Sequence, residues 1–340
     1  MKTTSNLFKK VGCFTDIHFG LKHNSRQHNQ DCIDFLNWFI SEAKSRGVET
    51  CIFLGDYHHH RASINMSTLS FIIESLRLLS DGFETVYMIT GNHDLFYREK
   101  RDIHALEIGK EFPNIKIIDR QFVSGDVAIL PWLVEDEWKK VKDIKTKYMF
   151  GHFEIPGFRM NAQVEMPDHG EIQKSHFTHQ DLVFSGHFHK RQSQGKVHYI
   201  GNPFGHNFSD SSDFERGAMF LEWGGQPEYV NWTDGPKYIT CTLSSLLSDV
   251  DNYLLPKMHL KVILDVDISY EEANYLRETF TENYDIREFK LLHDHSDVEE
   301  HEFEGEITIQ SVDQIVVEQI TAIDSNTFST TKLLDIYNRL

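Results

Sequence analysis

The tetrapeptide Gly91-Asn92-His93-Asp94 follows an apolar, β-branched run at 85–90 that is typical of a buried strand. It therefore places an amide, an imidazole and a carboxylate on the loop that leaves the carboxyl end of a strand. Open α/β sheets bind their ligands at that end. Alone, the tetrapeptide is more typical of an ordinary turn than of a ligand site, because Gly, Asn and Asp are frequent turn residues. Four further strand ends decide between these two interpretations.

The first part of the chain alternates predicted strands and helices. We predict strands over 11–15, 50–54 and 85–90, and helices over 28–46 and 66–80, where apolar residues recur at helical spacing. This order predicts a parallel sheet with right-handed crossovers. A helix is also predicted over 102–111. Short strands are predicted near 115–118, 127–130, 148–150 and 182–185. Later strands are predicted at 197–200, 217–222 and 228–232, and the short turns between them favour a second, more antiparallel sheet.

A turn-rich stretch at 233–236 marks the most favoured domain boundary, because the charge composition changes there. Beyond it we predict strands over 258–266 and 285–291, and between them a helix to about 283 that begins at the capping box of Ser269 and Glu272. Residues 293–306 are predicted to be a solvated acidic loop, with a metal-binding tract as the minor alternative. Two helices are expected at 311–323 and 328–339. The predicted domains are therefore 1–235, a small α+β domain with the acidic loop over 236–306, and a helical partner-docking segment over 307–340.

Charge and histidine are distributed unevenly along the 340 residues. Residues 241–340 hold 21 acidic and 7 basic side chains, so they carry most of the net charge of −18, whereas 16 of the 20 histidines precede position 241. We therefore expect metal binding in the front part, and we do not expect the acidic rear part to grip DNA, which requires Lys and Arg.

The sequence favours a cytoplasmic protein. No apolar run approaches the roughly 18 residues that span a bilayer, and the first ten residues lack the apolar core of a signal peptide. The four cysteines show no C-x-x-C spacing, and Cys13 and Cys51 lie inside strand-like runs, so we expect buried thiols in a reducing compartment.

Ligand-type side chains follow five of the predicted strands. A mixture of imidazoles and carboxylates suits Mn, Fe, Zn or Co better than Mg or Ca. There are too many for one tetrahedral ion, but they fit two ions that share a carboxylate. Two ions about 3.5–4 Å apart can hold a bridging hydroxide and clamp a phosphoryl group, and His93, next to Asn92, is placed to protonate the leaving oxygen. The strand-end residues are Asp16, His18, Asp56, Asn92, His93, His152, His187 and His189.

The motifs D-I-H, G-D, G-N-H-D, G-H and G-H-F-H, in this order, resemble the five motifs of the calcineurin-like metallophosphoesterases. Together with T-D-I-H-F-G at 15–20, L-P-W at 130–132 and Y-I-G-N-P at 199–203, they are similar to the SbcD-type DNA-repair nucleases, and most similar to the nuclease subunits of T-even-type phage recombination endonucleases. The resemblance covers about 10–235. It implies an α/β fold of two facing mixed β-sheets flanked by helices. The elements predicted beyond 235 add a smaller α+β C-terminal domain.

Residue by residue, the resemblance implies two divalent ions, most plausibly Mn²⁺. The first would be bound by Asp16, His18, Asp56 and His189. The second would share Asp56 and be bound by Asn92, His152 and His187.

Around these ligands, the resemblance implies that His93 stabilises the phosphate and is the general acid. Relatives often carry a histidine three residues after the bridging Asp, here His59, although the assignment within the run at 58–60 stays open. Asp94 is expected to orient His93. Arg61 is a candidate phosphate contact, and a plain surface charge is an equal alternative.

The resulting hypothesis is a Mn²⁺-dependent DNA exonuclease and endonuclease that acts on double-stranded DNA and DNA ends in recombination and double-strand-break repair. The resemblance implies an SbcC-type ATPase as partner, and a homodimer within a heterotetramer. Phe71 and Leu78 lie off the main apolar stripe of the helix at 66–80, so they are candidates for the homodimer face, with burial under another segment as the alternative.

Two alternatives use the same residues. A metallophosphatase or phosphodiesterase acting on a protein or small molecule would need the same metal cage. A non-catalytic scaffold is disfavoured because no ligand position is lost. The near-neutral charge of 1–240 weakens the nuclease hypothesis, although basic residues at 98–101 and 190–191 could flank a DNA groove, with solvated loops as the alternative.

Overall fold

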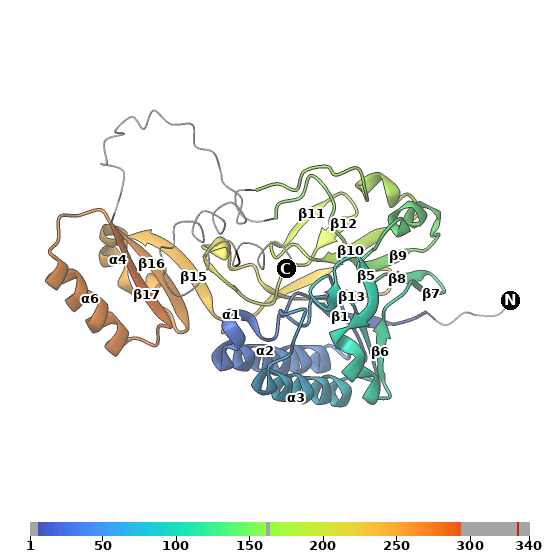
Figure 1. Cartoon of the computed structure of the whole chain (residues 1–340), viewed down its shortest axis with the longest axis horizontal. Helices are drawn as coiled ribbons and strands as arrows, with labels where there is room; N and C mark the ends of the chain where they lie inside the picture. The colour runs from blue at the N-terminus through green and yellow to red at the C-terminus, as the bar shows by residue number, and fades with distance from the viewer. Residues whose placement is uncertain (1–5, 161–163, 294–331, 333–340) are drawn as a thin grey trace. The chain divides into compact units, whose positions relative to one another are not determined.

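The computed structural model of the chain describes residues 6–160, 164–293 and 332. The described residues up to His293 belong to one compact unit (Figure 1).

The first sheet is six-stranded and mixed, with the strand order β14-β13-β1-β2-β3-β6. Neighbouring pairs among β1, β2, β3 and β6 are parallel, as the alternation of strands and helices predicted. Strand β13 adds to β1 in antiparallel register, and β14 pairs antiparallel with β13. The bounds are Lys10–Phe14 for β1, Thr50–Phe53 for β2, Thr85–Ile89 for β3, Ile115–Ile118 for β6, Gly217–Glu222 for β13 and Glu228–Asn231 for β14.

The second sheet is also six-stranded, with the order β11-β12-β10-β9-β8-β7. Its central pairs are parallel, and only the outer strands β7 and β11 are antiparallel to their neighbours. The expectation of a more antiparallel sheet is therefore wrong, because long crossovers, including the 3₁₀ segments η2 (Glu137–Asp143) and η3 (Lys174–His176), join its central strands. The bounds are Phe122–Ser124 for β7, Val127–Ile129 for β8, Tyr148–His152 for β9, Leu182–Gly186 for β10, Gln192–Gln194 for β11 and Val197–Tyr199 for β12.

The two sheets face each other across a shared apolar core, because successive side chains of a strand point to opposite faces. In β1, Val11 and Cys13 belong to the core between the sheets, whereas Phe14 faces the helices. Phe150 and Phe184 enter the same inter-sheet core from the second sheet. Burying a side chain of this size contributes about 1.5–3 kcal/mol. The two facing mixed sheets match the fold predicted from the sequence.

Helices α2 (Arg26–Ser45) and α3 (Met66–Gly82) pack side by side on the outer face of the first sheet (Figure 1). The side chains of Ser25 and Asn65 accept backbone N–H groups at the two helix starts. Gly47, just past the end of α2, has φ 65°, which is the left-handed conformation expected of a C′ glycine. A short turn, α1 (Leu21–Asn24), precedes α2. All four cysteines are buried and free, as predicted for Cys13 and Cys51.

The helix predicted at 102–111 forms only in part, as a 3₁₀ segment over its second half. Residues Leu95–Tyr97 (β4) and Lys100–His104 (β5) form an antiparallel hairpin, and a 3₁₀ segment, η1 (Ala105–Glu111), follows. The backbone N–H of Ala105 donates to the carbonyl oxygen of Asp94 at 2.8 Å, which holds the end of the hairpin at the G-N-H-D loop.

A separate three-stranded parallel sheet has the order β15-β16-β17, with bounds Lys237–Thr242, Met258–Leu264 and Glu288–His293. Helices α4 (Leu243–Ser248), α5 (Val250–Tyr253) and α6 (Tyr270–Asn283) accompany it. The capping box of Ser269 and Glu272 forms as predicted, whereas β15 and β11 were not predicted. This sheet has its own apolar core, which includes Leu243, Leu260 and Phe280.

The division of the chain at 235 and 306 stays a prediction. The acidic loop and the two terminal helices fall almost entirely outside the described residues. Within the described ranges, no helix is long and apolar enough to cross a membrane.

Candidate dinuclear metal centre

The fold brings the five predicted motifs to one place. Strands β1, β2 and β3 are parallel neighbours in one sheet, and β9 and β10 are parallel neighbours in the other. The motifs lie at the carboxyl ends of these strands, where the contacts described below join the two sheets. Four predicted ligands, Asp16, His18, Asp56 and His187, have positive φ angles of 50° to 91°. Such conformations cost about 1–3 kcal/mol each outside glycine and are concentrated at functional sites.

Asp16, His18 and His189 form the first group of ligand-type side chains. Their ligand atoms all lie within 4.8 Å of one another. The Nε2 atoms of His18 and His189 are each 3.9 Å from Asp16 Oδ1. Asp16 is fully buried, and the Thr15 hydroxyl donates to its other oxygen at 2.7 Å.

Asp56, His152 and His187 form the second group, also within 4.8 Å. The Oδ1 atom of Asn92 lies 3.1 Å from His152 Nε2 and 3.0 Å from His187 Nδ1, so the predicted amide ligand belongs to this group. Asp56 lies between the groups, because its Oδ2 is 3.4 Å from His152 Nε2 and 3.7 Å from His18 Nε2. One carboxylate oxygen thus faces both groups.

These side chains fit two divalent cations. Asp16 Oδ1 and both ring nitrogens of the buried His18 have no hydrogen-bond partner. An unpaired buried polar group costs about 1–3 kcal/mol, and more where it is charged. Cations bound between the carboxylates and imidazoles would satisfy these atoms.

The electrostatics of the cluster favour ligand chemistry. Burial lowers the pKa of His18 far below its usual value, and Asp56 offsets this only in part, so the ring is a neutral imidazole that can bind a metal. Burial raises the pKa of Asp56, but His152 and His18 outweigh it and hold the pKa well below its usual range. Burial lowers the pKa of His152, but the Asp56 carboxylate raises it to about 9.

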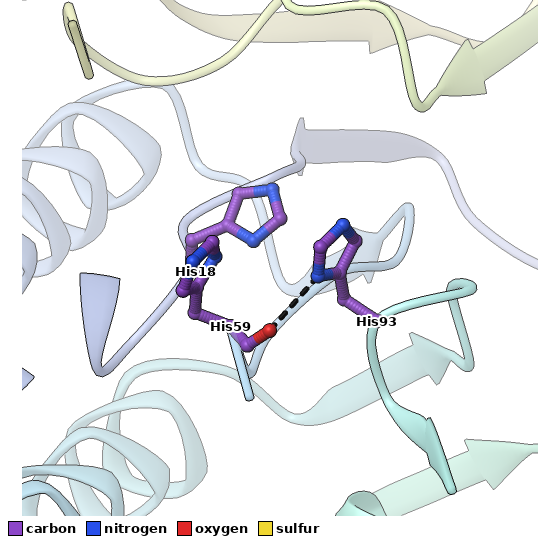
Figure 2. A group of neighbouring side chains, drawn as sticks. All are labelled: His18, His59 and His93. Atoms are coloured by element: carbon purple, nitrogen blue, oxygen red, sulfur yellow. Dashed lines mark hydrogen bonds between the residues drawn. The ribbon is translucent and has the colours of Figure 1, made fainter. Parts of the chain in front are cut away.

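His93 and His59 lie together beside His18 (Figure 2). His93 Nδ1 is 2.8 Å from the carbonyl oxygen of His59, which assigns the proton to Nδ1 and leaves Nε2 free. The His59 and His93 rings stack at a centroid distance of 5.4 Å, and the ring of His18 is 4.8 Å from that of His93. In contrast, His58 is buried with Nδ1 3.2 Å from Asp94. The structure therefore brings His59, of the three consecutive histidines, together with His93.

The expectation that Asp94 orients His93 is wrong in the structure, because the hydrogen bonds of its carboxylate go elsewhere. Oδ1 accepts the backbone N–H groups of Tyr57 and His58, and Oδ2 accepts those of Asp56 and Gly91, at 2.9–3.0 Å. Asp94 therefore ties the loop of the bridging carboxylate to the G-N-H-D loop. It acts on the position of Asp56.

Two glycines that precede ligand residues allow the loops of the cluster to pack closely against one another. A Cβ atom at Gly91 would lie 2.2 Å from Asp56 Oδ1, and Gly55, with φ 101°, would place one 2.4 Å from His152 Nδ1. The recurrence of glycine before ligand residues in the sequence thus has a steric cause at these two positions.

The structure does not tie every predicted residue to this cluster. Arg61 makes no hydrogen bond or ion pair with any described residue. Arg98 pairs with Glu154 at 3.1 Å, Arg101 pairs with Glu137, and Lys190 pairs with Asp213 at 3.1 Å. The basic residues at 98–101 and 190–191 therefore include cations engaged by carboxylates of the chain itself.

Two residues of the cluster were not predicted. His206 is buried, its ring centroid is 5.2 Å from that of His189, and neither ring nitrogen has a partner. Glu154 Oε1 lies 3.5 Å from His187 Nε2. Glu154 follows His152 by two residues, the same spacing as in D-x-H, which could have identified it. His206 follows Y-I-G-N-P by three residues, a weaker signal.

The fold and this cluster define a metallophosphoesterase. Residues 9–191, more than half of the chain, match the model of the calcineurin-like phosphoesterase family, and the chain belongs to that family. This confirms the resemblance that the motifs indicated.

Among curated proteins, the chain is 29% identical over 224 residues to exonuclease subunit 1 of Enterobacteria phage T4. The match covers 63% of this chain and 65% of that protein, which is less than two thirds of its length.

Solved structures similar to the chain include a nuclease MPE from Pseudomonas putida, with 20% identity, a TM-score of 0.30, and coverage of 55% of this chain and 66% of that one. A dimetal phosphatase from Danio rerio has 12% identity, a TM-score of 0.38, and coverage of 63% and 92%.

Proposed function

We propose that the chain is a metal-dependent DNA nuclease that hydrolyses phosphodiester bonds as an exonuclease and an endonuclease. The observation that carries this proposal is the Asp56 carboxylate, whose Oδ2 faces one group of ligands on each side. Family membership supports phosphoester hydrolysis, and similarity to a phage exonuclease subunit supports DNA as the substrate.

Seven side chains would hold two ions, which we propose to be Mn²⁺. Asp16, His18 and His189 hold one, and Asn92, His152 and His187 hold the other, with Asp56 shared between them. When bound, such ions supply Lewis acidity and lower the pKa of water at the site.

His93 then supplies the proton for the leaving oxygen. Because its Nδ1 donates to the His59 carbonyl, Nε2 is the atom that can carry the transferred proton. His59 positions this ring through that carbonyl, and its own ring stacks on that of His93. Asp94 fixes the loop of Asp56 by four backbone hydrogen bonds.

The wider role follows from charge. The net charge is −18, and three of the basic residues predicted to flank a DNA groove, Arg98, Arg101 and Lys190, are engaged by carboxylates, so they are poorly placed to neutralise several phosphates at once. We infer that an SbcC-type ATPase supplies most of the affinity for double-stranded DNA ends, in a complex that contains a homodimer of this chain. The complex would act in recombination and double-strand-break repair in the cytoplasm.

The activity is tested by incubating the purified chain with linear duplex DNA and plasmid DNA, with Mn²⁺ or with EDTA. We expect degradation of linear DNA only with Mn²⁺. Turnover of para-nitrophenyl phosphate without DNA cleavage, with or without the ATPase, would instead identify a phosphatase. Co-purification with the ATPase, followed by cleavage with and without ATP, tests the proposed partner.

A further inference from the structure

A cavity of about 550 Å³ lies beside the candidate metal centre. One wall comes from the turn after β1 and from the segment 206–208, and the other comes from the strands of the three-stranded sheet. Phe208 and Tyr238 form an aromatic corner of this cavity, with ring centroids 5.1 Å apart. Neither the metal ligands nor the His93 and His59 pair form part of the wall.

Cations outnumber carboxylates in this wall. Lys22, Arg287 and Lys290 line the cavity, and Glu288 is the one carboxylate among its lining residues. The ammonium group of Lys261 also lies 4.6 Å from the centroid of the Phe208 ring. Burial lowers the pKa of His259, which also lines the cavity, to about 4, so this ring adds no charge at neutral pH. A cationic cavity in a chain of net charge −18 indicates an anionic ligand.

Lys22 carries the most informative of these charges. Arg287 contacts Asp31 at 3.4 Å, and Lys290 contacts Glu288, whereas Lys22 has no ion pair with any described residue. Its ammonium group donates to the Tyr238 hydroxyl and lies 5.0 Å from the centroid of the Tyr238 ring. Lys22 is thus a positioned cation with no carboxylate in contact among the described residues, and Glu288 and Asp31 act on its charge from a greater distance.

The backbone that presents Lys22 is strained. Lys22, His23 and Asn24 have φ angles of 55°, 56° and 63°, a run of left-handed residues that contains no glycine. The turn is held by the N–H of Asn24, which donates to the Gly20 carbonyl at 2.9 Å, and by the N–H of Gly20, which donates to Asn29 Oδ1 at 2.8 Å. Strain of this kind is retained where it positions a functional group.

His206 joins the cavity to the metal centre. It lines the cavity, it is 1% exposed, and both ring nitrogens lack a hydrogen-bond partner. Its ring centroid is 5.6 Å from that of His18 and 5.2 Å from that of His189. A ligand in the cavity therefore reaches a buried, unpartnered imidazole that contacts two predicted metal ligands.

We propose that this cavity is a phosphate-binding subsite for the DNA strand, which holds a backbone phosphate next to the one that is cleaved. Lys22, Arg287 and Lys290 bind the phosphate oxygens, and Phe208 packs against the attached nucleoside. A single nucleotide in a cavity of this kind is unpaired, so the ligand is a single-stranded end. This inference rests on the proposed nuclease function. It means that the DNA strand extends from the metal centre into this cavity.

The test uses a fluorescent single-stranded oligonucleotide and fluorescence anisotropy, with Ca²⁺ replacing Mn²⁺ to limit cleavage. The double variant Lys22→Ala, Lys290→Ala removes two cations of the wall. Arg287 is left in place because it also pairs with Asp31, and its loss would leave that buried carboxylate with only the longer contact to Lys257. We expect Kd to rise roughly tenfold or more, and the slope of log K against log salt to fall by up to about 0.7, because the cavity holds one phosphate and each neutralised phosphate of a single strand contributes about 0.7.

The matched control is the double variant Lys44→Ala, Lys142→Ala, which removes two exposed lysines that do not line the cavity. It loses the same net charge, and we expect its Kd to change less than about twofold. Circular dichroism and metal content check that both double variants fold and keep the metal centre. Equal weakening in the two double variants would overturn the subsite, because net charge alone would then explain the loss.

Hydrolysis of bis(para-nitrophenyl) phosphate by the wild-type chain with Mn²⁺ separates this inference from the proposed function. If this small diester is hydrolysed but the cavity variant binds DNA with wild-type affinity and salt slope, the subsite is wrong and the phosphodiesterase stands. If the diester and DNA are both left intact while the cavity variant loses DNA affinity, the nuclease is wrong and the binding site stands. Binding of thymidine monophosphate to the same variant is measured as well. If the cavity variant loses this binding but keeps its affinity for the oligonucleotide, the cavity binds a free nucleotide and not the DNA strand.

Discussion

Asp94 shows how one buried side chain can set the position of a catalytic loop. Each of its oxygens accepts two backbone N–H groups, so an Asn in its place must aim its NH₂ group at two donors in either orientation. We expect Asp94→Asn to lower the free energy of unfolding by about 2–6 kcal/mol, at about 1–3 kcal/mol for each of the two unsatisfied N–H groups. Urea unfolding measures this. The exposed Asp126→Asn should change it by less than about 0.5 kcal/mol, and equal effects would show that the hydrogen bonds of Asp94 contribute little.

His93→Ala should remove the proton donor without removing an ion. Loss of a general acid typically costs about 10²–10⁴-fold in rate, so we expect DNA cleavage to fall by that factor with both metal ions retained. Elemental analysis reports metal content beside the cleavage assay. His60→Ala is the matched control, because His60 adjoins His59 but belongs to neither ligand group. An ion lost together with activity would make His93 a ligand.

Asp56→Asn should be more damaging than the loss of a ligand at the edge of the cluster. Because Oδ2 of Asp56 faces both groups, the substitution weakens both ion sites, whereas His189→Ala weakens one. We expect Asp56→Asn to lose at least one ion and all cleavage, with no recovery at high Mn²⁺, and His189→Ala to recover in part. Substantial recovery of Asp56→Asn would falsify the bridging role.

The pKa of His152 predicts the pH dependence of metal binding. Asp56 raises this pKa to about 9, above the usual value of about 6.5. The proton bound to His152 therefore stabilises the fold fully below about pH 6.5, and this contribution is lost as the pH rises through about 9. A cation must displace that proton, so we expect the affinity for Mn²⁺ to rise between pH 6.5 and 9. Calorimetric titration of chelator-treated protein at several pH values, in buffers of different ionisation enthalpy, measures affinity and proton release. A pH-independent affinity would contradict the assignment.

Elements with a strong apolar periodicity could be predicted from the sequence. Elements that depend on tertiary pairing could not. Helices α2 and α3 begin within two residues of the predicted positions, because apolar spacing and capping residues are local signals. The hairpin of β4 and β5 depends on the pairing of Leu95 with His104 and on the bond from Ala105 to Asp94, which residues 102–111 alone do not reveal. Strand β15 was missed although Tyr238, Ile239 and Cys241 are buried in it; its parallel pairing with β16 is visible only in the fold.

The candidate site shows the same division between local and tertiary signals. Its seven predicted ligands come together because each follows a strand and the strands are parallel neighbours. The role of Asp94 and the place of His206 depend on how loops from different strands meet, which sequence spacing does not encode.

At the scale of the whole molecule, the predicted homodimer face stays a prediction. Phe71 and Leu78 are half-buried and pack against the core that α2 and α3 share. The guanidinium group of Arg26 also lies 5.5 Å from the centroid of the Phe71 ring. Part of their apolar surface is therefore covered within the chain itself, as the alternative interpretation expected.

The C-terminal segment supplies the last prediction. Val312, Ile315, Val316, Ile320 and Ile323 repeat at helical spacing in the sequence, and so do Leu333, Ile336, Tyr337 and Leu340. Helical anchors at this spacing commonly dock into an apolar groove of a partner, and we propose that the partner is the ATPase. Every candidate metal ligand precedes position 190, so deletion of 307–340 should leave metal content and basal Mn²⁺-dependent cleavage unchanged.

The same deletion should abolish both ATPase binding and ATP-dependent stimulation, measured by pull-down and by cleavage with and without ATP. Ile315→Glu with Ile336→Glu in the full-length chain removes the apolar anchors without shortening it, and Gln314→Glu with Asn338→Glu is the control for added charge. We expect the first pair to lose the ATPase and the second to keep it. A truncated chain that binds the ATPase with wild-type affinity contradicts the docking role. If the truncated chain fails to fold, the segment belongs to the core instead. The two pairs of substitutions then show whether these side chains also contact the partner.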